Sequence, residues 1–172
     1  EAKTAGEQLG GNSYAGRGII IGKTESGKAV TAYFIMGRSE NSRNRLFEID
    51  GKGQVFTKPF DESKVEDPSL IIYRAVAPVD NYLIVTNGDQ TDTIADGLAA
   101  GKTAREALFT REFEPDAPNF TPRISGVITF EDDGFSYEIS ILKSADQEGN
   151  ACSRFFFEYP AIGGIGHLIH TY

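Results

Sequence analysis

A chain of 172 residues with 40% hydrophobic and 24% charged residues suits one globular domain that buries a core, and excludes a disordered or fibrous protein. Its formal net charge of −8 argues against nucleic acid or an anionic membrane as a partner, because both need a basic face on the protein. Cys152 is the single cysteine, which excludes an intrachain disulfide and fits a reducing compartment. With no membrane-length apolar run and no apolar core of a signal peptide in residues 1–11, these features predict a cytoplasmic protein.

The chain begins with a short polar stretch. We expect residues 1–11 to form a flexible segment and residues 12–172 to form a single domain. The chain starts at Glu1 instead of Met and stops within an apolar stretch. We therefore expect either a processed form of a longer protein or a form truncated at its C-terminus.

Strand signals dominate the first half. Apolar and β-branched runs at 19–23 and 30–36 flank a turn at Gly27 and predict a hairpin. Residues 46–50 and 54–57 flank Gly51 and Gly53 and predict a second hairpin, and residues 70–77 and 82–86 predict a third. Tyr73 would lie in the middle of a strand.

Helical signals follow, and then strands return. Thr91 or Asp92 can cap a helix that stops near Gly101, and Thr103 with Glu106 forms a capping box for a second helix. Strands are expected at 123–130, 135–142, 152–159 and 165–172. Strands, two adjacent helices and strands again predict an α+β fold with mainly antiparallel sheets, and not a βαβ nucleotide fold.

An arginine cluster follows the second expected strand. Three of the nine arginines lie within residues 37–45 of an otherwise acidic chain. The guanidinium group fits phosphate and carboxylate oxygens, so the cluster indicates either an anion-binding loop or an Arg-rich solvated turn. Tyr14-Ala15-Gly16-Arg17, ahead of the first strand, offers a fourth candidate cation.

Other constellations carry weaker signals. Residues 111–123 place three carboxylates among three prolines, which suits either a rigid acid–base loop or a solvated crossover. Asp89 and Asp92 suit a turn and helix cap better than a cation site. His167 and His170 would point to opposite faces of a strand, so we expect no metal site, and Cys152 is expected in the core.

Several short segments follow one another along residues 12 to about 125. They are Asn12-Ser13-Tyr14-Ala15-Gly16-Arg17, Thr31-Ala32-Tyr33, Arg38-Ser39 with Asn44-Arg45, Ile71-Ile72-Tyr73, Val85-Thr86-Asn87-Gly88 with Thr91-Asp92, and Thr121-Pro122-Arg123-Ile124. Together, and in this order, they resemble the archaeal-type inosine monophosphate (IMP) cyclohydrolase family and its bacterial relatives.

The resemblance implies an activity and a fold. Family members convert the formamido-imidazole-carboxamide ribotide to IMP with loss of water in purine biosynthesis. They need no metal, cofactor or covalent intermediate. Their fold is a four-layer α-β-β-α sandwich like that of the N-terminal-nucleophile hydrolases, without self-cleavage. A small purine ribotide would then be the partner. The oligomeric state is left undecided, and a homo-oligomer that shares pockets between subunits is one alternative.

The resemblance also implies site residues. Tyr73 and Glu114 would be the catalytic pair, with Arg38 close to them, and Glu112 or Asp116 remains an alternative to Glu114. The substrate-binding set would be Tyr14, Arg17, Ser39, Asn44, Arg45, Asn87, Asp92 and Arg123.

Three departures from the family pattern keep other readings open. Arg74 stands where an Asn is common, Gln90 stands where a His is usual, and the segment between Arg38 and Arg45 is longer. These departures motivate a non-catalytic purine-ribotide-binding protein as the alternative. An amide hydrolase on the same fold would need a Ser, Cys or Thr at a mature N-terminus, and Glu1 is none of these.

Overall fold

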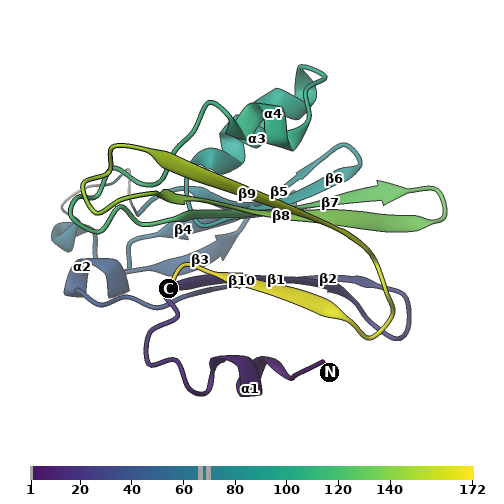
Figure 1. Ribbon diagram of the computed structural model, residues 1–172, viewed down its shortest axis with the longest axis horizontal. Helices are drawn as coiled ribbons and strands as arrows, with labels where there is room; N and C mark the ends of the chain where they lie inside the picture. Colours follow the sequence, from purple (N-terminus) through teal and green to yellow (C-terminus); the bar gives the residue numbers. More distant parts are fainter. Residues whose placement is uncertain (1, 66–67, 69–70) are drawn as a thin grey trace.

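Two antiparallel sheets lie face to face in the computed structural model, which describes residues 2–65, 68 and 71–172 (Figure 1). The small sheet has the strand order β10-β1-β2, and the large sheet runs β3-β4-β5-β6-β7-β8-β9. All neighbouring strands in both sheets pair antiparallel. The expected α+β class with mainly antiparallel sheets is therefore confirmed.

The elements follow the expected order of strands, helices and strands. The strands are β1 Arg17–Lys23, β2 Ala29–Ile35, β3 Leu46–Ile49, β4 Val55–Lys58, β5 Arg74–Val79, β6 Tyr82–Thr86, β7 Arg123–Glu131, β8 Gly134–Ser144, β9 Cys152–Pro160 and β10 Gly166–His170. The helices are α1 Ala5–Leu9, α2 Glu40–Arg43, the 3-10 helix η1 Glu62–Lys64, α3 Gln90–Ala99 and α4 Ala104–Leu108.

One core fills the space between the two sheets. Ile19 and Ile21 alternate along β1 with one residue between them, so both face the large sheet, and both are fully buried. They meet Val85 of β6 and Ile124 and Ile128 of β7 in one cluster. This period-two burial holds the small sheet against the middle of the large one.

A second core lies on the opposite face of the large sheet. Helices α3 and α4 cover that face (Figure 1), where Ile94 and Leu108 pack on Ile84 and Leu142 of the strands. The expected capping box at the start of α4 forms, with Thr103 and Glu106 bonding each other's backbone N–H groups. Within the described part of the chain, no helix has the length and apolar character needed to cross a membrane.

Several element boundaries differ from the sequence expectation. α3 begins at Gln90, earlier than either Thr91 or Asp92 predicted, because the buried Thr91 hydroxyl bonds Thr86 at 2.7 Å and so cannot cap the helix. β5 begins at Arg74, so Tyr73 precedes the strand instead of lying within it. The predicted start of that strand, Leu70, lies outside the described residues.

Two short helices fall in segments where no helix was expected. The 1–11 segment contains α1, closed by a capping box between Thr4 and Glu7, and none of its residues is buried. The arginine-rich segment was expected to be a loop, but residues 40–43 turn into α2. Ser39 and Ser42 hold its start by bonding each other's backbone N–H groups.

The pairing of β1 with β10 generates a testable prediction. Gly22 faces Gly166 across this ladder, and a Cβ on Gly22 would lie 2.6 Å from both the Gly166 Cα and the Ile165 carbonyl oxygen. We expect Gly22→Ala to lower the free energy of unfolding by about 1–3 kcal/mol, because backbone atoms cannot yield as a flexible side chain can. Urea denaturation checks this, with Gly51→Ala as the control, since a Cβ on Gly51 meets nothing within 4 Å. Equal stability of the two variants would contradict the prediction.

Candidate functional site

A polar pocket of about 280 Å³ collects residues from distant parts of the chain. Three arginines, Arg17, Arg38 and Arg45, share it with the carboxyl groups of Glu114 and Asp116. Of the residues predicted for the site, six line this pocket: Tyr14, Arg17, Arg38, Ser39, Arg45 and Glu114.

Glu114 is the buried acid of this pocket. It lies in the linker between α4 and β7, where its backbone N–H donates to the Thr121 carbonyl at 2.8 Å. The residue is only 5% exposed. Burial raises the pKa of the Glu114 carboxyl to about 7, against the charges of Arg17, Arg123 and Arg45, which lower it. A carboxyl with this pKa exchanges protons near neutral pH.

Asp116 and Glu112 lie in different surroundings. The Asp116 carboxylate accepts hydrogen bonds from the Thr121 backbone N–H at 2.7 Å and the Thr121 hydroxyl at 2.5 Å. Its acceptor oxygens are therefore engaged in shaping the loop. The Glu112 side chain is 63% exposed and lies 3.9 Å from Arg154, outside the pocket. Of the three carboxylates, Glu114 has the environment expected for a proton-accepting group.

Arg45 and Arg17 present positive charge to the pocket. The Nε and Nη1 atoms of Arg45 are buried and have no hydrogen-bond partner among the described residues. Unpaired buried donors of this kind are costly, which is typical of a site that an anion completes. Arg17, at the start of β1, is 8% exposed. Burial is the largest single influence on the pKa of Arg17 and lowers it, but the combined charges of Glu114, Tyr33, Tyr73 and Tyr14 exceed that effect and raise the pKa.

Tyr73 lies beside the pocket, in hydrogen-bond contact with Tyr33. The two hydroxyl oxygens are 2.6 Å apart. The Tyr73 backbone is fixed by Thr57 of β4, whose hydroxyl accepts from the Tyr73 N–H at 3.1 Å and donates to the Ile71 carbonyl at 2.6 Å. The β4–β5 ladder has an irregular register at Val55 and Phe56, next to this point. An irregularity there redirects the side chains of the adjoining segment.

Arg38 lies against two aromatic rings that also contact each other. Its guanidinium carbon lies 4.7 Å from the centre of the Tyr14 ring and 5.1 Å from that of Tyr172. It also approaches Asn119 at 3.5 Å. Aromatic faces attract the guanidinium and limit its freedom. Arg43, in contrast, is exposed and does not line the pocket.

Arg123, predicted to line the pocket, lies behind it in a polar network. Its Nη1 atom donates to Asp89 at 2.6 Å and to Gln90 at 2.8 Å, and Asp89 also pairs with Arg111 at 2.6 Å. Gly88 is packed between this network and Glu114, because a Cβ there would lie 2.7 Å from Arg123 Nη1 and 3.5 Å from Glu114 Oε1. Arg123 therefore forms its ion pair with Asp89.

Three other predicted site residues support the surrounding loops and do not line the pocket. Asn87 bonds the Ile124 N–H at 2.8 Å and the Pro122 carbonyl at 2.8 Å. Asn44 bonds the backbone of Asp61 in both directions at 2.7 Å. Asp92 pairs with Arg74 at 2.6 Å on the edge of α3.

Sequence reasoning gave no role to Tyr33, Asp89 or Tyr172 in the site. Tyr33 falls within one of the matched segments. Its position on a strand whose side chains alternate between the two faces of the sheet could have indicated that it is buried. No sequence pattern indicates that Tyr33 meets Tyr73, forty positions away, or that Asp89 meets Arg123. His167 and His170 engage different partners, Tyr137 and the Tyr172 carbonyl.

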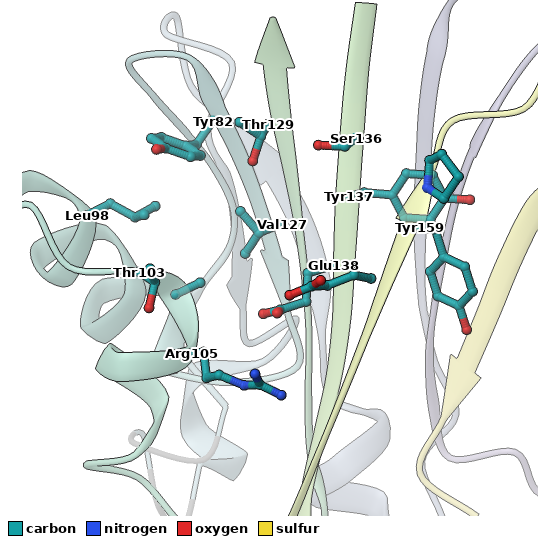
Figure 2. Close-up of a pocket in the computed structure, with 13 residues that line it drawn as sticks. Tyr82, Leu98, Thr103, Arg105, Val127, Thr129, Ser136, Tyr137, Glu138 and Tyr159 are labelled. Carbon is teal, nitrogen blue, oxygen red and sulfur yellow. The ribbon is translucent and has the colours of Figure 1, made fainter.

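A larger hollow of about 760 Å³ lies elsewhere, between the two helices α3 and α4 and strands β6 to β9 (Figure 2). Glu138 and Glu158 lie opposite each other on β8 and β9 in it, and Figure 2 shows Arg105 on the helical side. Burial and the Glu158 charge raise the pKa of Glu138. None of the residues predicted for the site lines this hollow. The smaller pocket, with its arginines and buried acid, is the stronger candidate.

Comparisons with known proteins give one family. A family model described as IMP cyclohydrolase-like protein matches residues 14–172. The IMP cyclohydrolase of Methanopyrus kandleri is 39% identical over 116 residues, which are 65% of this chain and 57% of that protein. The IMP cyclohydrolase of Methanococcus maripaludis is 34% identical over 146 residues, or 80% of this chain and 71% of the relative. The chain thus spans less than two thirds of the first of these relatives.

The raised pKa of Glu114 predicts a pH-dependent stability. The folded chain binds this proton more tightly than the unfolded chain, whose carboxyl has its ordinary pKa of 4.5. The free energy of unfolding should therefore fall as pH rises from 4.5 through about 7, by up to about 3 kcal/mol. Glu114→Gln removes this loss, so we expect the variant to gain stability relative to the wild type between pH 5 and pH 8. Urea denaturation at both pH values measures it.

The control for this measurement is Glu112→Gln, whose side chain is exposed. Its free energy of unfolding should change between the two pH values by the same amount as that of the wild type. Parallel pH dependence of Glu114→Gln and the wild type would contradict the assignment of the raised pKa to Glu114.

Proposed function

Because the chain belongs to the family of IMP cyclohydrolase-like proteins, we propose that it closes the second purine ring, converting the formamido-imidazole-carboxamide ribotide to IMP and water. The observation that carries the proposal is the buried Glu114 carboxyl, with a pKa of about 7, in one pocket with Arg17, Arg38 and Arg45. An anionic substrate needs positively charged groups such as these arginines, and proton transfer near neutral pH needs a group with a pKa near 7, such as Glu114.

Glu114 acts as the base for ring closure. The carboxamide nitrogen attacks the formyl carbon, and the new C–N bond forms as an N–H proton passes to the Glu114 carboxylate. Amide nitrogen is a poor nucleophile, so this proton transfer is needed while the bond forms. Half of the Glu114 carboxyls are ionised near pH 7, which keeps the base available.

Tyr73 and Arg38 provide donors for the formyl oxygen. This oxygen gains negative charge during the attack and takes up the Tyr73 proton to become a hydroxyl. In the second step the hydroxyl takes up the proton held by Glu114 and leaves as water, while the formamido nitrogen gives up its N–H proton to Tyr73. One well-placed donor in a buried site typically accelerates such a reaction by about 100- to 1000-fold. The backbone bonds that fix Tyr73, and the contact of Arg38 with the Tyr14 and Tyr172 rings, support donors that are already in place.

The 5′-phosphate binds at Arg45. Two buried nitrogens of its guanidinium, which have no hydrogen-bond partner in the described part of the chain, match the oxygens of a phosphate. The reaction is intramolecular, so fixing the phosphate at one end also restricts the substrate to its cyclising conformer. Arg17, which lines the same pocket and interacts with the Glu114 carboxylate, adds a further positive charge for the substrate.

We also propose that the architecture corresponds to the four-layer α-β-β-α sandwich of the N-terminal-nucleophile hydrolases. The position of α1 beyond the small sheet, with α3 and α4 beyond the large one, supports this assignment (Figure 1). The chain performs this chemistry in the cytoplasm without self-cleavage, as expected for purine biosynthesis, and needs no cofactor.

Steady-state turnover tests the proposal. The purified protein should convert the formamido ribotide to a purine, seen as a change in ultraviolet absorbance, with kcat/KM rising through about pH 7 as Glu114 ionises. Glu114→Gln should lower kcat by at least about 100-fold and still bind the ribotide, while Glu112→Gln keeps wild-type turnover. Binding of purine ribotides by the wild type without turnover would favour the non-catalytic alternative.

Arg45→Ala tests the phosphate assignment. Loss of charged hydrogen bonds to the phosphate should raise KM by about 10- to 100-fold and change kcat much less. The control is Arg43→Ala, which removes a nearby exposed arginine outside the pocket. A fall in kcat at unchanged KM would place Arg45 at the reacting atoms instead.

A further inference from the structure

Tyr33 makes a contact that the reaction outlined above does not use. It lies on β2 of the small sheet, opposite Ile19 of β1. Its ring packs against the core between the sheets and meets the Phe47 ring edge-on, with centroids 5.7 Å apart. Its hydroxyl lies 2.6 Å from that of Tyr73, which belongs to the segment leading into the large sheet. The pair therefore links the two sheets beside the pocket.

The direction of this hydrogen bond matters because each hydroxyl has one proton. If Tyr73 donated to Tyr33, its proton would be unavailable to the pocket. If Tyr33 donates, the Tyr73 proton is free for an oxygen of the bound ligand. Donation from Tyr33 also polarises the Tyr73 hydroxyl and makes it a stronger donor.

We propose that Tyr33 is a positioning residue that donates its proton to the Tyr73 oxygen and so directs the Tyr73 proton to the formyl oxygen of the substrate. This inference rests on the proposed function, in which Tyr73 is a donor to that oxygen. As the substrate oxygen takes the Tyr73 proton, negative charge builds on Tyr73, and the Tyr33 hydroxyl stabilises it. No bond to Tyr33 forms or breaks.

The charged groups around Tyr73 support this arrangement. Arg17 faces it from β1, Arg45 from the segment after α2, and Glu114 from the linker before β7. Burial raises the pKa of Tyr73, while Arg45, the Tyr33 hydrogen bond and Arg17 lower it, and the Glu114 charge raises it. Burial, followed by the charge and hydrogen bond of Tyr73, raises the pKa of Tyr33 well above its ordinary value. Tyr73 is thus the hydroxyl of the pair that gives up a proton more readily.

Tyr33→Phe tests the inference, because it removes one oxygen and keeps the ring. We expect kcat to fall by about tenfold or more with KM changed less than about twofold, since the lost bond acts on the charge of the transition state. The control is Tyr82→Phe, on the helical side of the large sheet, which should keep wild-type kinetics.

A second readout does not depend on turnover. In protein labelled with ¹³C at the tyrosine Cζ, the Tyr73 resonance is identified by its loss in Tyr73→Phe. Tyr33→Phe should move the titration of that resonance to higher pH, because a bond that lowers the pKa of Tyr73 is gone. Should Tyr33→Phe fold poorly, fluorotyrosine at position 33 keeps the hydroxyl, makes it a stronger donor and should move the titration to lower pH.

The outcomes separate this inference from the proposed function. If the wild type turns over the ribotide and Tyr33→Phe has the same kcat, or if Tyr33→Phe leaves the Tyr73 titration unchanged, the role of Tyr33 is overturned. The proposed activity would not be affected by either result. In a further outcome, the wild type fails to turn over the ribotide while Tyr33→Phe still shifts the Tyr73 titration. That result would show the hydrogen bond but overturn the activity, and with it the catalytic role of the bond.

Discussion

Burial of one carboxyl group among several guanidinium groups is the constraint on which the candidate site depends. Glu114 loses most of its contact with water, and this loss raises the pKa of its carboxyl. Arg17, Arg123 and Arg45 counteract the loss of hydration, and the resulting pKa is about 7. The pKa of Glu114 stays near neutral only if these opposing effects remain balanced.

That balance requires that no arginine pairs directly with Glu114. Asp89 takes the guanidinium of Arg123 at 2.6 Å and so keeps it from the acid. Arg38 is held by the Tyr14 and Tyr172 rings. A direct ion pair would lower the pKa of Glu114 strongly and remove the base from the neutral range. The residues that hold these arginines therefore help to set the pKa of Glu114, together with the groups that line the pocket.

The two sheets provide the rigidity that this balance needs. Their interface carries the buried isoleucines, and at its edge the Tyr33–Tyr73 contact joins the small sheet to the segment before β5. Glu114 is fixed by the loop in which Asp116 and Thr121 bond each other. The backbone at Tyr73 and at Glu114 thus has its own hydrogen bonds, which position these two side chains.

Local sequence signals determined most of the secondary structure, because period-two burial at Ile19 and Ile21, turn glycines and the Thr103–Glu106 capping box act over a few residues. They failed at the start of α3, where the tertiary partner Thr86 takes the hydroxyl of Thr91. Residue type and resemblance pointed to Arg17, Arg38, Arg45 and Glu114. Only the tertiary structure separated Glu114 from Asp116 and Glu112 and brought Tyr33 to Tyr73, because burial and long-range contacts depend on how the two sheets pack.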